Sequence, residues 1–230
     1  MVQRILPVTT CYVGTQDAKK GFAFAKRAFD IVVSLVMIVA LLPLLLVLAA
    51  ITAVDTKGCP LFAQTRMGRN NQPFKMLKFR TMNVNAPANV ATHKLRDAAR
   101  YISPVGEVLR KFSLDELPQL FNILKGDMSF VGPRPVVLSE KDLISLRVRN
   151  GACTVRPGLT GWSQIHGRDR LPIRQKAELD GYYAQNQSME LEFSILLKTV
   201  SYVLHSTGVH EGADPSISAS PAMQREERSA

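Results

Sequence analysis

The sequence has few of the residues that build disulfide frameworks or metal centres. Its 230 residues include three cysteines, Cys11, Cys59 and Cys153, and four histidines. The cysteines are too far apart for a CxxC metal site, and three is a poor number for a disulfide framework. We therefore expect reduced thiols and a protein that faces the cytoplasm. The histidines show no ligand spacing, which argues against a metal hydrolase.

Long apolar runs are also scarce, because only Ile31–Val54 has the length of a membrane segment. A single run disfavours a polytopic membrane protein. Residues 1–24 lack the layout of a signal peptide, since their longest apolar run is short and Lys19-Lys20 follow it. We assign residues 1–24 to a loosely ordered N-terminal extension. A Ser-, Pro- and Glu-rich stretch at residues 207–230 is typical of a disordered tail.

The apolar run predicts a membrane anchor over residues 25–56, with a buried soluble helix as the alternative. Pro43 lies near its midpoint, where it kinks or breaks a helix. Basic residues flank both ends, and such flanks favour the cytoplasmic side. A re-entrant hairpin satisfies both observations, because each half of about twelve residues spans about 18 Å at the helical rise.

Acidic residues are scarce from Lys57 to Lys111, where eleven Lys and Arg face only Asp97 and Glu107. Such a stretch favours an anionic partner, whether nucleic acid, phospholipid headgroups or a phosphorylated substrate. The chain length suits one domain with appendages. We assign residues 57–206 to a domain with interfacial helices, which the motifs described below identify as the catalytic domain.

Short elements in this region predict an α+β fold, with short helices around a small β-hairpin. The hairpin joins Pro60–Arg66 to Phe74–Met82 through a turn-rich loop in which Asn71 tolerates a positive φ. Lys78 and Arg80 should project from one side of the second strand, as a binding surface or as a solvated face.

A second pair of strands is expected at Thr154–Arg156 and Trp162–Ile165. Helices are expected at Lys94–Ile102, Val105–Phe112, Leu117–Leu124, Val136–Val148, Ile173–Gln187 and Met189–His205, the last packed in the core or lying at a membrane interface.

The stretch Leu109–Pro135 has the strongest chemical signal, an adjacent carboxylate pair at Asp115-Glu116. Ser113-x-x-Glu116 predicts a capping box, which would place both acids at a helix N-terminus. That end favours ionised carboxylates, which serve as nucleophiles or as Mg²⁺ ligands. An ordinary helix start with a solvated acidic turn is the alternative.

Six motifs in order carry a resemblance to a known family, over roughly residues 25–210. The sequence resembles the bacterial sugar transferase family, the small monotopic phosphoglycosyl transferases. The motifs are Lys26-Arg27-x-Phe29-Asp30, Lys78-Phe79-Arg80-Thr81-Met82, Asp115-Glu116-Leu117-Pro118-Gln119-Leu120, Gly126-Asp127-Met128-Ser129, Gly132-Pro133-Arg134-Pro135 and Val155-Arg156-Pro157-Gly158-Leu159-Thr160-Gly161-Trp162.

The resemblance implies transfer of a sugar 1-phosphate from a nucleoside diphosphate sugar, usually UDP-linked, to polyprenyl (undecaprenyl) phosphate, with release of UMP. This reaction begins the assembly of capsule, O-antigen or exopolysaccharide. It implies that Asp115 is the nucleophile and that Glu116 assists metal or proton chemistry, with Mg²⁺ as cofactor held by the dyad. Arg134 and Arg168 match phosphate-contacting cations, and Lys78 and Arg80 fall in a motif that lines the site.

The resemblance also implies a place in the bacterial inner (cytoplasmic) membrane, with membrane lipid as a partner, no nucleic acid partner and the catalytic domain on the cytoplasmic face. A homodimer is compatible with the sequence. The family's helix break commonly contains Ser-Pro, whereas this chain has Leu42-Pro43. The main alternative is a non-enzymatic, membrane-anchored basic protein that binds anionic lipid or nucleic acid, but it leaves Asp115-Glu116 unexplained.

Overall fold

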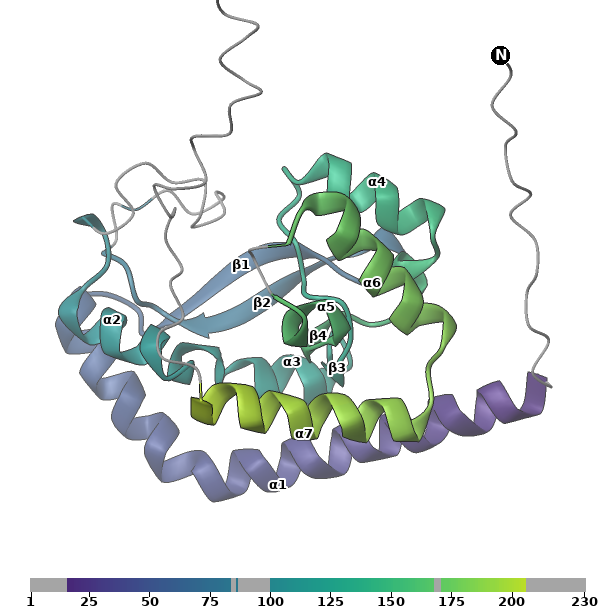
Figure 1. Cartoon of the computed structure of the whole chain (residues 1–230). Coiled ribbons are helices and arrows are strands. Elements are labelled where there is room, and N and C mark those ends of the chain that lie inside the picture. The colour runs from purple at the N-terminus through teal and green to yellow at the C-terminus, as the bar shows by residue number, and fades with distance from the viewer. Residues whose placement is uncertain (1–15, 84–85, 87–99, 168–170, 206–230) are drawn as a thin grey trace, which may run out of the picture.

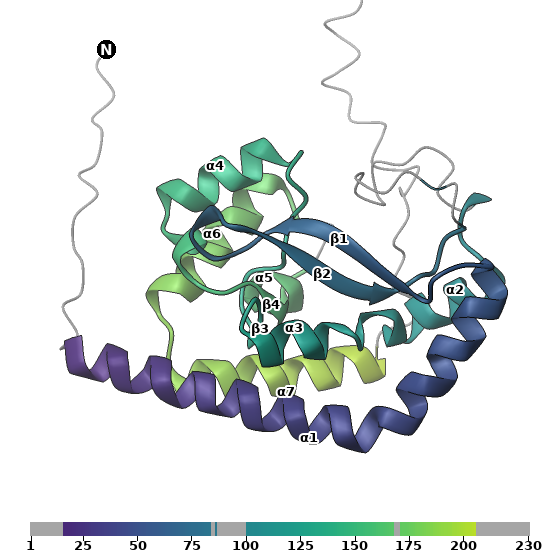
Figure 2. The same ribbon diagram turned by 180° about the vertical axis from the view of Figure 1, so that it is seen from behind.

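The computed structural model describes residues 16–83, 86, 100–167 and 171–205. These residues form an α+β fold, in which a long N-terminal helix lies along one side of short helices and two small sheets (Figure 1; the opposite view is Figure 2). The tail at residues 207–230 and the first part of the N-terminal extension lie outside the described residues, as do Arg168 and most of the helix expected at Lys94–Ile102.

Helix α1 runs without interruption over Gln16–Thr56 and contains Pro43. Both views show it bending partway along its length. Proline cannot donate a backbone hydrogen bond to the carbonyl of Val39, and its ring crowds that turn, which accounts for a bend near this point. The sequence predicted two half-helices meeting at a break, whereas the structure has one bent helix that also includes residues 16–24.

Much of α1 is both apolar and exposed. Its stretch Lys20–Thr56 has a mean hydropathy of 3.2 in its most apolar window, which is only 22% buried. Val36, Val39 and Leu46 are each more than half exposed, while Ile38, Leu45 and Leu48 pack against the domain. A soluble core helix would bury such a surface, so α1 indicates membrane association.

The first part of α1 is fastened to the domain by polar contacts. Both terminal nitrogens of Arg27 donate to the last carbonyls of α3 (Gln119–Lys125), those of Ile123 and Leu124, at 2.7 and 2.8 Å. Buried Asp30 accepts from the hydroxyl of Ser129 and the amide of Phe130, both at 3.1 Å. The basic motif before the apolar run therefore joins the anchor to the domain.

The first sheet is the predicted hairpin. Strands β1 (Leu61–Met67) and β2 (Pro73–Phe79) pair antiparallel, with Phe62 opposite Lys78. Asn70 and Asn71 in the connecting turn have φ of 54° and 57°, which confirms the positive φ predicted for Asn71.

The second sheet differs from the prediction. Strands β3 (Ser129–Val131) and β4 (Gly158–Thr160) pair in parallel. Thr154–Arg156 is not a strand, because Ala152–Thr154 forms a 3₁₀ helix, and Trp162–Ile165 is helix α5. Such short runs resemble strands by composition, and their periodicity does not separate a strand from a short helix.

The remaining helices surround the sheets, and most are close to their predicted ranges. They are α2 (Pro104–Lys111), α3, α4 (Lys141–Arg149), α6 (Ile173–Gln185) and α7 (Met189–His205). The helix predicted at Val136–Val148 begins only at Lys141, because Val137 pairs with Arg66 of β1 in an isolated β-bridge. Pro118 disturbs no helix, because it stands at the N-cap of α3. Helix α7 lies beside α1 in both views, and the rings of Phe193 and Phe29 are 5.8 Å apart. The main core contains Leu120, Ile123, Met128 and Ile195.

Candidate active site

The Asp115-Glu116 pair lies on a 3₁₀ turn, Leu114–Glu116, between α2 and α3. The capping box predicted from Ser113 is wrong. Ser113 has φ 55° and ψ 23°, and its side chain caps nothing, whereas an N-cap residue needs an extended backbone. The left-handed backbone at Ser113 redirects the chain after α2. The acids therefore precede α3 and do not form its first turn.

Glu116 is held between two cations. Its Oε1 accepts from Lys78 Nζ at 2.9 Å and from Arg134 NH2 at 2.8 Å. Burial by itself raises the pKa of Glu116, but the charges and hydrogen bonds of Arg134 and Lys78 outweigh it and hold the pKa well below its usual range. Glu116 is therefore ionised across the physiological range.

Asp115 is buried, with only 5% of its surface exposed. Its Oδ2 lies 3.8 Å from Lys78 Nζ, too far for a hydrogen bond but close enough for charge attraction. Lys78 is thus nearer to Glu116 than to Asp115. The two adjacent carboxylates consequently have different surroundings, although both belong to one charged cluster.

Of the two cations predicted on the second strand of the hairpin, only one reaches this cluster. Lys78 points to the dyad, whereas Arg80 donates from Nε to the carbonyl of Cys59 at 2.9 Å. The guanidinium carbon of Arg80 also lies 5.9 Å from the centre of the Phe62 ring. Phe62 is the partner of Lys78 across the hairpin, which is consistent with both cations on one side of the strand. Their side chains nevertheless diverge.

Arg134 reaches Glu116 from the turn that follows β3. A Cβ at Gly132 would lie 2.3 Å from the carbonyl oxygen of Arg156, and one at Gly161 would lie 2.1 Å from that of Gly132. Any side chain would clash at these distances, so the glycines allow the turn and the β4–α5 segment to pack closely. Pro133 and Pro135 stiffen the backbone on both sides of Arg134.

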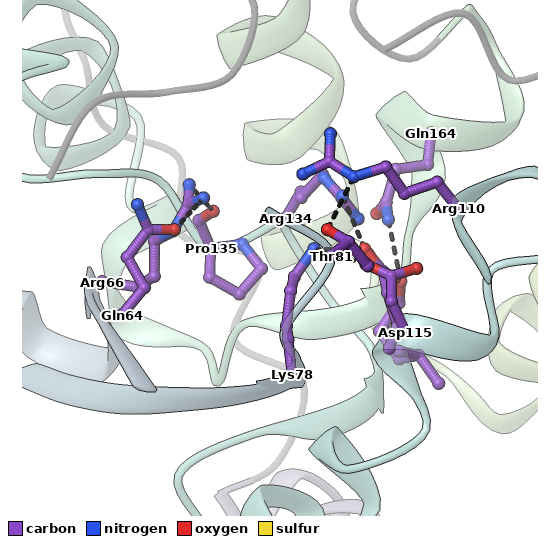
Figure 3. Close-up of polar contacts among 11 residues, drawn as sticks. Gln64, Arg66, Lys78, Thr81, Arg110, Asp115, Arg134, Pro135 and Gln164 are labelled. Carbon is purple, nitrogen blue, oxygen red and sulfur yellow. Dashed lines mark hydrogen bonds and ion pairs between the residues drawn. The ribbon is translucent and has the colours of Figure 1, made fainter. Parts of the chain in front are cut away.

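Sequence reasoning assigned no role to Arg110, Thr81 or Gln164, which the close-up draws together with Asp115, Lys78 and Arg134 (Figure 3). Arg110 Nε donates to the hydroxyl of Thr81 at 2.8 Å. Arg110 stands five residues before Asp115, in the basic stretch, so its charge was the available signal. Gln164 is 3% exposed, and its amide donates to the carbonyl of Leu159 at 2.9 Å.

The donor set suits a magnesium ion that also binds substrate. Within the described ranges no three His, Cys, Asp or Glu side chains come together as a metal cage. Asp115 and Glu116 supply two carboxylates, and Mg²⁺ commonly binds one or two carboxylates together with phosphate oxygens and water. The dyad fits such an ion if the substrate completes its coordination.

Comparison with known proteins agrees with this geometry. The family model described as bacterial sugar transferase matches residues 22–206. The chain belongs to the bacterial sugar transferase family. The resemblance seen in the six motifs is thereby confirmed, the chain is an enzyme, and the non-enzymatic binding protein considered from the sequence is rejected.

Relatives in the bacterial sugar transferase family have two sizes. The exopolysaccharide production protein ExoY of Sinorhizobium fredii is 40% identical over 199 residues, which cover 80% of this chain and 87% of the relative. The UDP-N-acetylgalactosamine-undecaprenyl-phosphate N-acetylgalactosaminephosphotransferase of Aeromonas hydrophila is 37% identical, over 81% of this chain and 45% of the relative. The undecaprenyl-phosphate galactose phosphotransferase of Salmonella typhimurium is 35% identical, over 84% and 43%. The chain therefore spans most of ExoY but less than half of the latter two enzymes.

Proposed function

We propose that the protein transfers a sugar 1-phosphate from a UDP-sugar to undecaprenyl phosphate and releases UMP. Asp115, a buried carboxylate in a cluster of cations, carries this proposal. The substrate names of the Aeromonas and Salmonella relatives support the classes of donor and acceptor. The name of the ExoY relative supports a role in exopolysaccharide production, and we propose that this role is the first membrane step of the assembly.

In the first step, a carboxylate oxygen of Asp115 attacks the β-phosphorus of the donor. An oxygen–phosphorus bond forms, the bond from that phosphorus to the bridging oxygen breaks, and UMP leaves with the electron pair. Lys78, Arg110 and Arg134 neutralise the charge that builds up on the phosphate oxygens, which is the main requirement of phosphoryl transfer. Glu116 keeps Lys78 and Arg134 in place for that task.

In the second step, an oxygen of the lipid phosphate attacks the same phosphorus. The bond to Asp115 breaks, the carboxylate is regenerated, and the sugar leaves on a polyprenyl diphosphate. A covalent intermediate lets the soluble donor product depart before the lipid acceptor arrives.

Asp115 and Glu116 would hold Mg²⁺, together with phosphate oxygens of the donor. When bound, the ion would offset the charge of the diphosphate. Residues of the chain supply the remaining functions, since Asp115 is the nucleophile and the three cations bind phosphate. Arg168 is proposed as a further phosphate contact from its place in the sequence.

We place the enzyme at the bacterial inner membrane, with α1 as a re-entrant anchor and the catalytic domain, proposed as residues 57–206, on the cytoplasmic face. The bend in α1 and the basic residues on both flanks support this path. The exposed apolar residues Phe193, Leu197 and Val200 of α7, beside α1, would extend the membrane-facing surface. The dyad would then be reached by both donor and lipid.

The test is UMP release across a panel of UDP-sugars by the full chain in membranes. With the accepted donor, we expect Asp115→Asn to lower turnover at least about 1,000-fold, because the amide is not a nucleophile. Asp142→Asn, at an exposed acid on α4, is the matched control and should keep normal turnover. Circular dichroism and membrane fractionation should show both variants folded and membrane-bound. Near-normal UMP release by Asp115→Asn would reject the assignment.

A further inference from the structure

Arg147 is a buried cation that the proposed chemistry does not use. It lies on α4, near the C-terminal end, and is 7% exposed. Its Nε and NH2 both donate to Oδ2 of Asp180 on α6, at 2.9 and 2.6 Å. Its third nitrogen, NH1, donates to the backbone carbonyl of Arg134 at 2.9 Å. One guanidinium therefore joins two helices to the peptide of a proposed phosphate-binding residue.

The partner of Arg147 is also fully engaged. Asp180 is 1% exposed, and its Oδ1 accepts from the hydroxyl of Ser163 on α5 at 2.7 Å. The network thus connects α4, α5 and α6 with the Gly132–Pro135 turn. Both oxygens of the carboxylate and all three nitrogens of the guanidinium have a defined partner, so the orientation of Arg147 is fixed.

A second guanidinium holds the next carbonyl of the same turn. Arg66 NH1 donates to Pro135 O at 3.2 Å, and Arg66 is itself bound to Gln64. Arg134 O and Pro135 O are therefore held from α4 and from β1. These contacts fix the backbone of the turn. The side chain of Arg134 then extends from it and donates to Glu116 at 2.8 Å (Figure 3).

A buried ion pair is a poor source of stability, because desolvation of two charges offsets much of their attraction. Its better-attested use is to fix one arrangement among several. The contact of Arg147 with Arg134 O shows which arrangement is fixed here. A lysine at this position keeps the charge but lacks the planar fork that serves both Asp180 and the carbonyl.

We propose that Arg147, oriented by Asp180, is a positioning residue that aims Arg134 at the donor diphosphate. This inference rests on the proposed function, because it takes Arg134 as a donor-binding residue. Arg147 touches no substrate and acts through the backbone of Arg134. Its effect should therefore vanish when the side chain of Arg134 is removed.

A double-mutant cycle in the full chain tests this coupling. We expect Arg147→Lys to raise KM for the UDP-sugar about tenfold, with KM for undecaprenyl phosphate unchanged, a coupling of the size found between residues in contact. In an Arg134→Ala background, the same substitution should change donor KM less than about twofold. Arg149→Lys, at an exposed position on the same helix, is the control and should change neither constant.

Hydrogen exchange gives a second readout that needs no activity. A peptide covering residues 129–138 should exchange faster in Arg147→Lys than in wild type or Arg149→Lys, because the turn loses one of its restraints. Unchanged exchange would overturn the proposal. So would an equal rise in donor KM in both backgrounds, or an unchanged donor KM in Arg147→Lys. These results leave the reaction standing, whereas absence of UMP release from every UDP-sugar would overturn the proposed function itself.

Discussion

Asp115 and Glu116 are neighbours in the chain with different contacts in the fold. Glu116 makes close contacts with Lys78 and Arg134, whereas Asp115 stands 3.8 Å from Lys78. A carboxylate that is the strongest partner of two cations is well placed to hold them. Its neighbour, still within their field, is the better candidate for nucleophilic attack on a phosphorus. In the proposed mechanism, Glu116 is therefore the holding group and Asp115 is the reacting group.

The low pKa of Glu116 predicts a pH dependence of stability. The unfolded chain takes up a proton on this residue near pH 4.3, whereas the folded chain resists protonation at that pH. The stabilisation is therefore present at neutral pH and is lost as the pH falls below about 4. We expect Glu116→Gln to lower the free energy of unfolding by about 2 kcal/mol at pH 7, with the difference from wild type shrinking towards pH 3.

Thermal or chemical unfolding of wild type and Glu116→Gln between pH 3 and 8 measures this difference. Glu190→Gln, at an exposed position on α7, is the control and should match wild type throughout. A deficit of Glu116→Gln that grows in acid would contradict the assignment, since it would mean that folding raises the pKa of Glu116 and does not lower it.

At the scale of elements, α1 has two roles, and different parts of the helix carry them. Residues before the apolar run, Arg27 and Asp30, bind the end of α3 and the start of β3. Residues within the run expose an apolar surface. Strand β3 leads directly into the turn that carries Arg134, so the anchor is braced against the element next to the site. Pro43 then determines where the helix bends.

The path of α1 through the membrane can be tested with the native cysteines. Cys11 precedes the helix, and exposed Cys59 follows it. In variants that keep one cysteine each, a membrane-impermeant maleimide should label both sites from the cytoplasmic side. The basic flanks account for this expectation, because both favour that side.

Cys153, kept alone in a third variant, marks the side of the catalytic domain. Labelling of Cys11 and Cys59 from opposite sides would show a spanning helix and reject the re-entrant path.

The same labelling in Pro43→Ala shows whether the bend is required. We expect this variant to expose one flank on the far side in part of the population, because a straighter helix of this length can cross a bilayer.

At the scale of the whole molecule, local signals in the sequence predicted most elements. Helix periodicity gave α7 with its observed bounds, and the turn-rich loop gave the β1–β2 hairpin with Asn71 at positive φ. The wrong predictions concern elements whose structure depends on contacts between residues far apart in the sequence. Ser129–Val131 becomes a strand only because Gly158–Thr160 pairs with it, and no period in either segment indicates that partnership.

The site shows the same division between local and distant information. Lys78, Asp115, Glu116 and Arg134 were identified from their motifs, and the fold brings them together. The prediction of a capping box was wrong because the backbone at Ser113 is left-handed, and nothing in a serine side chain indicates that conformation. Arg147 was missed for a different reason. Its role depends on Asp180, from another helix, and on a backbone carbonyl.

The most direct test of the mechanism is a search for the phosphosugar on Asp115. The full chain is incubated with its UDP-sugar in the absence of polyprenyl phosphate, quenched and digested, and the peptide that contains Asp115 is weighed by mass spectrometry. We predict an added mass of one sugar phosphate on that peptide, absent from Asp115→Asn and discharged when undecaprenyl phosphate is supplied. An enzyme that releases UMP only in the presence of the lipid, with no adduct on Asp115, would contradict the account.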